Sequence, residues 1–438
     1  MKKELKIAVF IFICIFAGFI LSIIITEKIN IDDIKSTYSN RSNIAGATST
    51  VIPAPSNAAY KFQANKVTVW IISLVWSMVI PVFFLLSGLS AKIKRWAQNK
   101  GKSFFVVTAL YFLIFSVINY IMNLPLDYYS GFARLHAFGL SNQTFFKWIG
   151  DSIKSMAIDT VISTLIIWIP YLLIKKSPKR WWLYTGLLSV PALAFMMFIS
   201  PVVIDPVFNK YVPLKNQQLE AQIHQLLDRT TIGNCAVYGI DKSVDTNQMN
   251  AYMTGMFGSK RIVLWDTTMN NLSDREILSI VAHETGHYML GHIWKGVVMG
   301  GLFIILCLFI IDRIAVWVLA KSNGRFGFSK LADVASLPLF ILIINILMLV
   351  GQPAINAVSR YEENEADRFA LELTQDNNAF NSSMIKLHMT SLSLPNPGKL
   401  YELWVYDHPT LKDRVEMGNS YKPWLQNKPL KYQEYFKK

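Results

Sequence analysis

Long apolar blocks separated by short polar gaps dominate the hydrophobic pattern of the chain. Seven blocks reach or approach the roughly 20 residues that a helix needs to span about 30 Å of hydrocarbon. They lie near residues 7–26, 68–90, 104–123, 156–174, 181–204, 294–320 and 334–355. The pattern therefore predicts a polytopic α-helical membrane protein with about seven transmembrane helices.

The composition agrees with a membrane protein and excludes other classes. The 438 residues are 52% hydrophobic and only 16% charged, whereas soluble domains have about 25% charged residues. This excludes a disordered or collagen-like chain and an ordinary soluble enzyme. The three cysteines are too few for a disulfide framework. The net charge of +14 would suit nucleic acid, but the basic residues gather between the apolar blocks, so we expect the lipid bilayer, and no nucleic acid, as partner.

The first apolar block resembles a signal peptide because Lys2, Lys3 and Lys6 precede it. Its apolar run is too long, however, and no small-residue cleavage site follows directly. We therefore interpret it as a membrane anchor. The stretch 28–66, rich in Ser, Asn, Ala and Thr, predicts a polar loop.

Two segments are long enough to fold outside the membrane. The chain therefore divides into a membrane domain with five spans, a first extramembrane segment, two further spans and a C-terminal extramembrane segment: 1–204, 205–293, 294–355 and 356–438. The first extramembrane segment predicts an amphipathic helix, a strand, a β-hairpin around a Gly-Met-Phe-Gly turn and a further helix, at 215–229, 234–240, 248–266 and 272–292. Ser273 or Asp274 is a suitable N-cap for that further helix. In the last segment, a helix from Val358 is expected to continue to about Leu392, before Pro395.

The candidate chemistry lies in His283-Glu284-Thr285-Gly286-His287. Residues four apart on a helix share one face, so both imidazoles can reach one metal ion. Glu284 is placed to take a proton from a metal-activated water molecule. The alternative is an amphipathic helix with two hydrogen-bonded histidines, but the helical context favours a zinc site.

A catalytic zinc needs a third protein ligand and keeps its fourth position open. The downstream candidates are three histidines and an acidic cluster: His292, His388, His408, Glu362, Glu363, Glu365 and Asp367. His292 lies nine residues from His283 on the same predicted helix, which is too far for both to reach one ion.

Helical periodicity separates the acidic cluster. Glu363 and Asp367 share one face, whereas Glu362 and Glu365 point elsewhere. A face with one carboxylate ligand and a second carboxylate to orient a ligating histidine is what a zinc site requires. The alternative is that all four carboxylates form a solvated acidic face.

Several segments around the zinc motif carry a family pattern. They are 201–214 (PVVIDPVFNKYVPL), 250–292, 359–371 (SRYEENEADRFAL), 385–393 (IKLHMTSLS) and 407–414 (DHPTLKDR). In this order they resemble the type I CAAX prenyl protease family of integral-membrane zinc metallopeptidases. The resemblance covers most of the chain from about residue 100 onward. It implies that 205–293 and 356–438 form a mostly helical, zincin-like catalytic domain with a small sheet.

The resemblance also implies the metal centre. His283, His287 and Glu363 would bind one Zn²⁺ per chain, with Glu284 as general base. Asp367 would support a ligand or donate a proton. The enzyme would be a zinc metalloendopeptidase that hydrolyses peptide bonds of membrane-associated or peptide substrates.

Further residues follow from the same resemblance. His408 begins a His-Pro-x-x-x-x-Arg motif that ends at Arg414; it would lie near the scissile carbonyl, with Arg414 just outside the ligands. Asn250, Ala251 and Tyr252 would bind an extended substrate by β-strand addition. The alternatives are an ordinary surface histidine and a plain hairpin strand. The chain departs from the family at Glu365, which adds a charge near the metal.

Three other functions are alternatives, and the first of them lacks a required residue. A site-2-type intramembrane protease would need a ligating Asp in a later span, and 334–355 contains none. A broad-specificity membrane quality-control metalloprotease would share the motifs and differ in substrate. A non-catalytic zinc-binding scaffold would not need Glu284 or an open coordination position.

The Lys and Arg residues in the short gaps predict the orientation. The basic gaps are at 92–102, 175–180 and 321–330, after the second, fourth and sixth spans. Because an even number of crossings separates each gap from the N-terminus, all of them lie on its side of the membrane, and this side should be cytoplasmic. The catalytic segments then face outward, whereas eukaryotic relatives place theirs in the cytosol. We therefore prefer a bacterial-type plasma membrane over the endoplasmic reticulum, which would make a prenylated substrate doubtful.

Overall fold

The computed structural model describes residues 2–39, 50–233, 235–255 and 260–437. Within these residues, seven helical segments are long and apolar enough to cross a membrane: Lys3–Ser39, Asn57–Leu86, Phe104–Ala137, Phe145–Lys176, Trp181–Phe208, His292–Ser322 and Val334–Thr374. The seven predicted spans are therefore confirmed. Most of these helices extend well beyond the apolar blocks.

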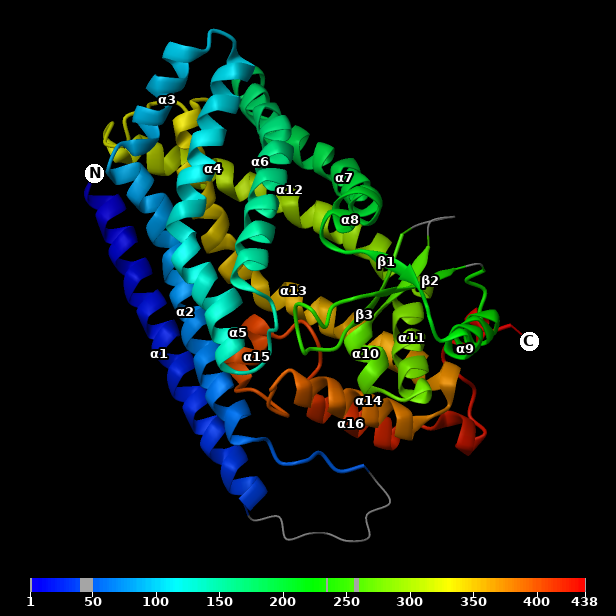
Figure 1. The fold of residues 1–438 in the computed structure, drawn as a ribbon. Helices are drawn as coiled ribbons and strands as arrows, with labels where there is room; N and C mark the ends of the chain where they lie inside the picture. The colour runs from blue at the N-terminus through cyan, green and yellow to red at the C-terminus, as the bar shows by residue number, and fades with distance from the viewer. Residues whose placement is uncertain (1, 40–49, 234, 256–259, 438) are drawn as a thin grey trace.

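The N-terminal half is a bundle of long helices. Its helices are α1 (Lys3–Ser39), α2 (Asn57–Leu86), α3 (Leu89–Lys100), α4 (Phe104–Tyr128), α5 (Arg134–Ala137), α6 (Phe145–Lys176), α7 (Trp181–Ile199) and α8 (Asp205–Phe208). Figure 1 shows α1, α2 and α4 side by side along one flank of the molecule.

The prediction of a polar loop over 28–66 is wrong at both ends of that stretch, and residues 40–49 lie outside the described part. Helix α1 continues to Ser39, and α2 begins at Asn57. Ser56 caps α2 by accepting a hydrogen bond from the Ala59 N–H. The two helices are also joined through Glu27, which accepts a hydrogen bond of 2.8 Å from Gln63, with both side chains buried. Contacts between α1 and α2 therefore stabilise the polar ends of these two helices.

A small four-stranded sheet lies beside the bundle. Its strands are β1 (Tyr211–Pro213), β2 (Ala236–Ile240), β3 (Ala251–Thr254) and β4 (Arg261–Trp265), in the order β1-β2-β4-β3. β1 is antiparallel to β2, and β2 is parallel to β4. β3 is antiparallel to β4, with Ala251 opposite Leu264. The two hairpin strands are confirmed, whereas most of the predicted turn lies outside the described residues. β3 is an edge strand.

Helix α9 (Gln217–Asp228), between β1 and β2, is the predicted amphipathic helix. After β4, three helices lead back to the membrane region: α10 (Asp266–Asn271), α11 (Asp274–Met289) and α12 (His292–Ser322). Ser273 caps α11 in a capping box with Glu276. The prediction of one helix through 292 is wrong, because the chain turns at Gly291 with φ of +68° and starts α12 at His292. Glycine adopts this left-handed conformation without steric cost.

Four further helices complete the fold. They are α13 (Leu337–Thr374), α14 (Asn377–Thr390), α15 (Lys399–Val405) and α16 (Leu411–Ser420). α13 runs through position 355, where the sequence suggested the end of a span, and carries the acidic cluster. The expected helix from Val358 through α14 is interrupted at Gln375, whose φ is +53°. The division of the chain into four segments stays a prediction.

The bundle and the sheet region have separate cores. Phe84, Tyr111 and Leu339 are among the buried residues of the core between the membrane helices. Ile223, Leu264 and Ile277 are buried in the core where the sheet, α9 and α11 pack on α13. α13 is part of both, so it links the membrane bundle to the sheet region (Figure 1).

Candidate metal centre

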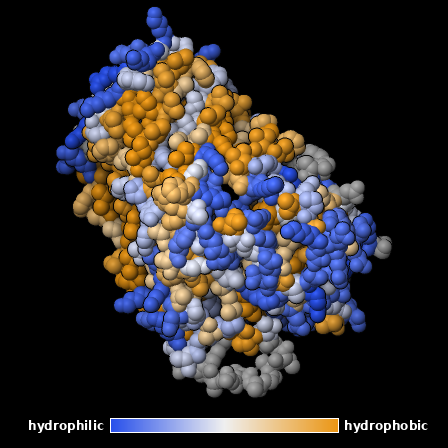
Figure 2. Space-filling view, in the orientation of Figure 1, coloured by the Kyte–Doolittle hydropathy of each residue, from blue (hydrophilic) through white to orange (hydrophobic). Residues whose placement is uncertain are grey.

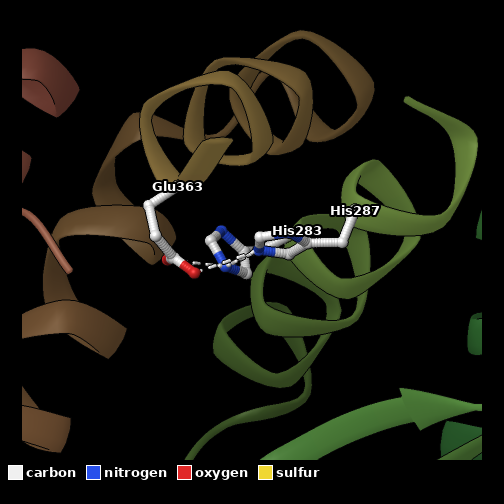
Figure 3. Close-up of side chains that lie close together, drawn as sticks. All are labelled: His283, His287 and Glu363. Atoms are coloured by element: carbon white, nitrogen blue, oxygen red, sulfur yellow. Dashed lines mark hydrogen bonds and ion pairs between the residues drawn. The ribbon is translucent and has the colours of Figure 1, made fainter. Parts of the chain in front are cut away.

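Two helices bring three potential metal ligands together. His283 and His287 extend from α11, and Glu363 extends from α13 toward them (Figure 3). The Nε2 atoms of His283 and His287 lie 3.3 and 3.2 Å from Glu363 carboxylate oxygens and 3.1 Å from each other. One ligand atom from each residue lies within 4.8 Å of the others. Of the candidates for a third ligand, Glu363 is the carboxylate that the fold brings to the two histidines.

The chemistry of this donor set fits a bound divalent metal ion. Two imidazole nitrogens and one carboxylate are a known ligand set of catalytic metal centres. His283 and Glu363 are both 6% exposed, and within the described residues Oε2 of Glu363 accepts no hydrogen bond. Burial disfavours a charged imidazole, but the carboxylates of Glu363 and Asp367 outweigh it and raise the pKa of His283 to about 10. The site therefore favours positive charge.

Close packing of α11 on α13 sets these distances. Gly286 lies between the two histidines, and a Cβ atom there would come within 3.2 Å of the Ala366 Cα atom and of the Phe369 ring. A larger residue would push the helices apart. Gly286 thus lets Glu363 approach the histidines.

A buried ion pair supports His283 from behind. Oδ1 of Asp367 lies 2.9 Å from Nδ1 of His283, and the same atom accepts a hydrogen bond from Arg414 of α16. Asp367 is fully buried and Arg414 is 6% exposed. A carboxylate on the far nitrogen of a ligating histidine fixes its tautomer and ring orientation. The expectation that Glu363 and Asp367 share the inward face agrees with this geometry.

His287 has a different partner, which the sequence did not predict. Nδ1 of His292 lies 2.9 Å from Nδ1 of His287, and Nε2 of His292 lies 3.7 Å from Glu365. Lys431 in turn pairs with Glu365 over 3.2 Å. His292 reaches His287 because the helix is broken at Gly291, so His292 does not follow the periodicity of α11. A glycine directly before the histidine was the signal that could have indicated this break.

His408 lies beside the carboxylate ligand. Its Nε2 atom is 3.3 Å from Oε1 of Glu363, and its Nδ1 atom is 2.7 Å from Asp407. Its side chain is 52% exposed, so one side of the ring faces outward. Burial disfavours the cation, but Asp407 and Glu363 raise the pKa of His408. His408 is therefore positioned at the open side of the centre as a hydrogen-bond donor.

Glu284 lies between the histidines and the edge strand. Burial raises the pKa of Glu284, whereas the imidazoles of His283 and His287 and the backbone N–H of Met253 in β3 favour its charged form. A carboxylate with a raised pKa can both accept and return a proton.

The three residues predicted to bind substrate lie on or beside β3. The backbone of Asn250 is bonded to α10 and β4, since its N–H donates to Thr268 and its carbonyl accepts from Trp265. Ala251 and Tyr252 begin β3, whose other edge has no strand partner among the described residues. The Tyr252 hydroxyl lies 3.1 Å from that of Tyr211. β3 packs against α11 and thus beside the metal centre.

Comparison with known proteins agrees with this geometry. Residues 213–419 match the model of peptidase family M48, and residues 45–210 match that of the CAAX prenyl protease N-terminal region with five membrane helices. The metalloprotease YhfN of Bacillus subtilis (strain 168), described as uncharacterized, is 38% identical over 337 residues, which are 76% of this chain and 79% of that protein.

Eukaryotic proteins are also similar. CAAX prenyl protease 1 of Saccharomyces cerevisiae is 34% identical over 327 residues, which are 71% of this chain and 72% of that protein. The crystal structure of S. mikatae Ste24p matches with a TM-score of 0.74 and 25% identity, covering 92% of this chain and 99% of that one. The resemblance seen in the sequence is therefore confirmed: the chain belongs to peptidase family M48 and is a membrane-embedded metalloprotease of the CAAX prenyl protease type.

Proposed function

We propose that the metal is zinc, one ion per chain, held by His283, His287 and Glu363. The observation that carries this proposal is the convergence of two imidazoles and one buried carboxylate within 4.8 Å. Zinc accepts such mixed nitrogen and oxygen ligands and keeps a fourth position for the reaction in catalytic sites. When bound, zinc supplies Lewis acidity, which polarises a carbonyl group and makes a water molecule more acidic.

We propose that Glu284 is the general base. Its position next to His283 and the raised pKa of its carboxyl group support this role. Glu284 takes the proton of the attacking water and returns it to the departing amine. His408 donates a hydrogen bond to the oxyanion as charge develops on the scissile carbonyl. Its half-exposed ring beside Glu363 supports this assignment.

Asp367 and Arg414 act as positioning residues in this mechanism. The sequence left open whether Asp367 supports a ligand or donates a proton. Its complete burial and its bonds to His283 and Arg414 favour support of the ligand. Asp367 holds His283 in one tautomer, and Arg414 keeps the Asp367 carboxylate ionised.

The substrate is a peptide that binds in an extended form along β3. β3 pairs with β4 on one side only among the described residues, so backbone groups of alternate residues in 251–254 face the other edge, where a strand can be added. Glu284 lies beside this edge. A cavity of about 460 Å³ between α7, α12 and α13 is lined almost entirely by apolar groups, including Met197, Phe303 and Met348. An apolar chain fits such a cavity, which supports a membrane-associated peptide substrate.

The test is the substitution Glu284→Gln in the purified protein. Loss of the general base should lower peptide turnover by about 10²–10⁴-fold, while zinc content stays at one per chain. Zinc retained with normal turnover in Glu284→Gln would mean that Glu284 is not the general base. Zinc without peptide turnover in the unchanged protein would favour the non-catalytic scaffold. Loss of zinc would mean that Glu284 itself is a ligand.

We further propose that the protein lies in a bacterial-type plasma membrane with the metal centre facing outward. The basic residues of α3 and of the gaps after α6 and α12 support this orientation. A cysteine in place of Asn99 should react only with a membrane-permeant reagent in intact cells, and one at Asn427 also with an impermeant reagent. The reverse pattern would place the metal centre in the cytosol.

The orientation separates two substrate classes. An outward site would meet membrane quality-control substrates rather than prenylated cytosolic proteins. Cleavage profiling of the purified protein, with matched prenylated and unprenylated peptides, distinguishes them. Strict dependence on the prenyl group would favour the CAAX-type substrate.

A further inference from the structure

The end of the bundle opposite the metal centre contains two adjoining cavities of about 650 and 370 Å³. They lie where α6 ends, α7 begins and the loop from α12 to α13 returns. Both are lined by Lys175, Lys330 and Ser329. Figure 1 places this end near α3, far from the sheet and α11. The proposed peptidase mechanism does not use these residues.

The larger cavity is apolar on the side of the bilayer. Trp181, Val316 and Leu319 line it, and Val316 of α12 is 53% exposed. The helix that carries this wall is a membrane span. The wall therefore continues into the surface that hydrocarbon chains of the bilayer cover.

The rim of the cavities is cationic. Lys175 and Lys330 are both exposed, and neither has an ion-pair partner within the described residues. Lys175 has an aromatic contact only, with its Nζ atom 5.4 Å from the centre of the Phe104 ring. Lys94 also lines the smaller cavity but is paired with Asp333. Two cations are thus free to bind an external anion.

The acidic groups at this place have partners. Asp312 lines the larger cavity and is buried, where it accepts a hydrogen bond of 2.7 Å from the Trp181 indole and lies 3.8 Å from Arg313. Asp333 is held by Lys94. Neither carboxylate neutralises Lys175 or Lys330.

The surrounding polar segments add positive charge. Between 87 and 103 and between 175 and 180 there is no Asp or Glu, and between 321 and 333 the single acidic residue is Asp333. The basic residues there are Lys92, Lys94, Arg95, Lys100, Lys102, Lys175, Lys176, Lys179, Arg180, Lys321, Arg325 and Lys330. Figure 2 shows hydrophilic residues capping this end directly above a hydrophobic band.

We propose that these joined cavities bind the headgroup of an anionic phospholipid. Lys175 and Lys330 contact the phosphate, Ser329 donates a hydrogen bond to it, and the acyl chains lie along Trp181, Val316 and Leu319. Basic pockets between membrane helices are typical sites of anionic lipid headgroups. The apolar wall that opens to the bilayer favours a lipid over a soluble phosphate, because a soluble phosphate has no hydrocarbon chain to pack against this wall.

The test uses the full-length protein in detergent, with lipid retention measured by native mass spectrometry. Phosphatidylglycerol is the probe, and phosphatidylcholine is the neutral comparison. The double variant Lys175→Gln/Lys330→Gln should retain at least about five-fold less phosphatidylglycerol. The matched control Lys176→Gln/Lys179→Gln removes two neighbouring charges that do not line the cavities, and it should retain lipid as the unchanged protein does.

Two outcomes would overturn the proposal. Equal loss in both double variants would mean diffuse attraction to a basic surface. Displacement of phosphatidylglycerol by free glycerol phosphate at similar concentration would mean a site for soluble anions. Unchanged melting temperature and unchanged peptide turnover of the double variant in phosphatidylcholine would establish that the protein remains folded.

Discussion

The metal centre and the basic end around Lys175 and Lys330 differ in how their charged side chains are buried and paired. At the metal centre, the carboxylates of Asp367 and Glu363 are buried and have partners within the chain: Asp367 pairs with His283 and Arg414, and Glu363 lies against three imidazoles. At the basic end, Lys175 and Lys330 are exposed and have no such partner within the described residues.

The difference has a physical reason. A buried charge without a partner costs much free energy, so the catalytic carboxylates exist only as parts of a network. An exposed lysine keeps its hydration and can exchange water for an external phosphate. The comparison predicts that single substitutions at the metal centre have large effects, whereas single substitutions at the basic end have small ones.

The largest effect is expected for Glu363→Ala. Without its carboxylate ligand the centre should lose its metal, and peptide turnover should fall to background, since the two histidines alone do not complete a catalytic site. Metal analysis and a peptide assay on the same samples measure both. The neighbouring carboxylate provides the control, because Glu362→Ala should keep metal and activity. Full metal occupancy with retained activity in Glu363→Ala would remove Glu363 from the ligand set.

A smaller effect is expected for His408→Phe. If its ring stabilises the oxyanion only in the transition state, turnover should fall by about 10²–10³-fold with little change in KM. Metal content should not change, which separates His408 from Glu363. His224, an exposed histidine of α9, is the control, and His224→Phe should behave as the unchanged protein. Near-normal turnover of His408→Phe would make it an ordinary surface residue.

The smallest of the three effects is expected for His292→Phe. His292 supports His287 from outside the metal ligands, and loss of such partners lowers metal affinity by about 10–100-fold. Competition with a chelator measures the affinity directly and does not depend on catalysis. His292→Gln keeps a polar group beside His287 and should recover part of the affinity. Equal affinity in all three proteins would show that His292 only fills space.

Local patterns explain what was predictable at the metal centre. The spacing of His283 and His287 follows from one helix, and so does that of Glu363 and Asp367. Their mutual contact was expected from chemistry and family resemblance. The contact of His292 with His287 does not follow from helical periodicity, because the left-handed conformation at Gly291 ends the helix between the two residues.

The same distinction holds for the fold. The sequence by itself determined the seven spans, because the length and hydropathy of a segment decide whether it can cross a bilayer. It also determined the two strands of the hairpin and the capped helix that carries the two histidines. Only the tertiary structure decided that the polar residues at the end of α1 and the start of α2 are helical, that α13 serves both the membrane bundle and the metal centre, and that Arg414 reaches Asp367. These features depend on contacts between residues far apart in the chain, and no local pattern encodes them.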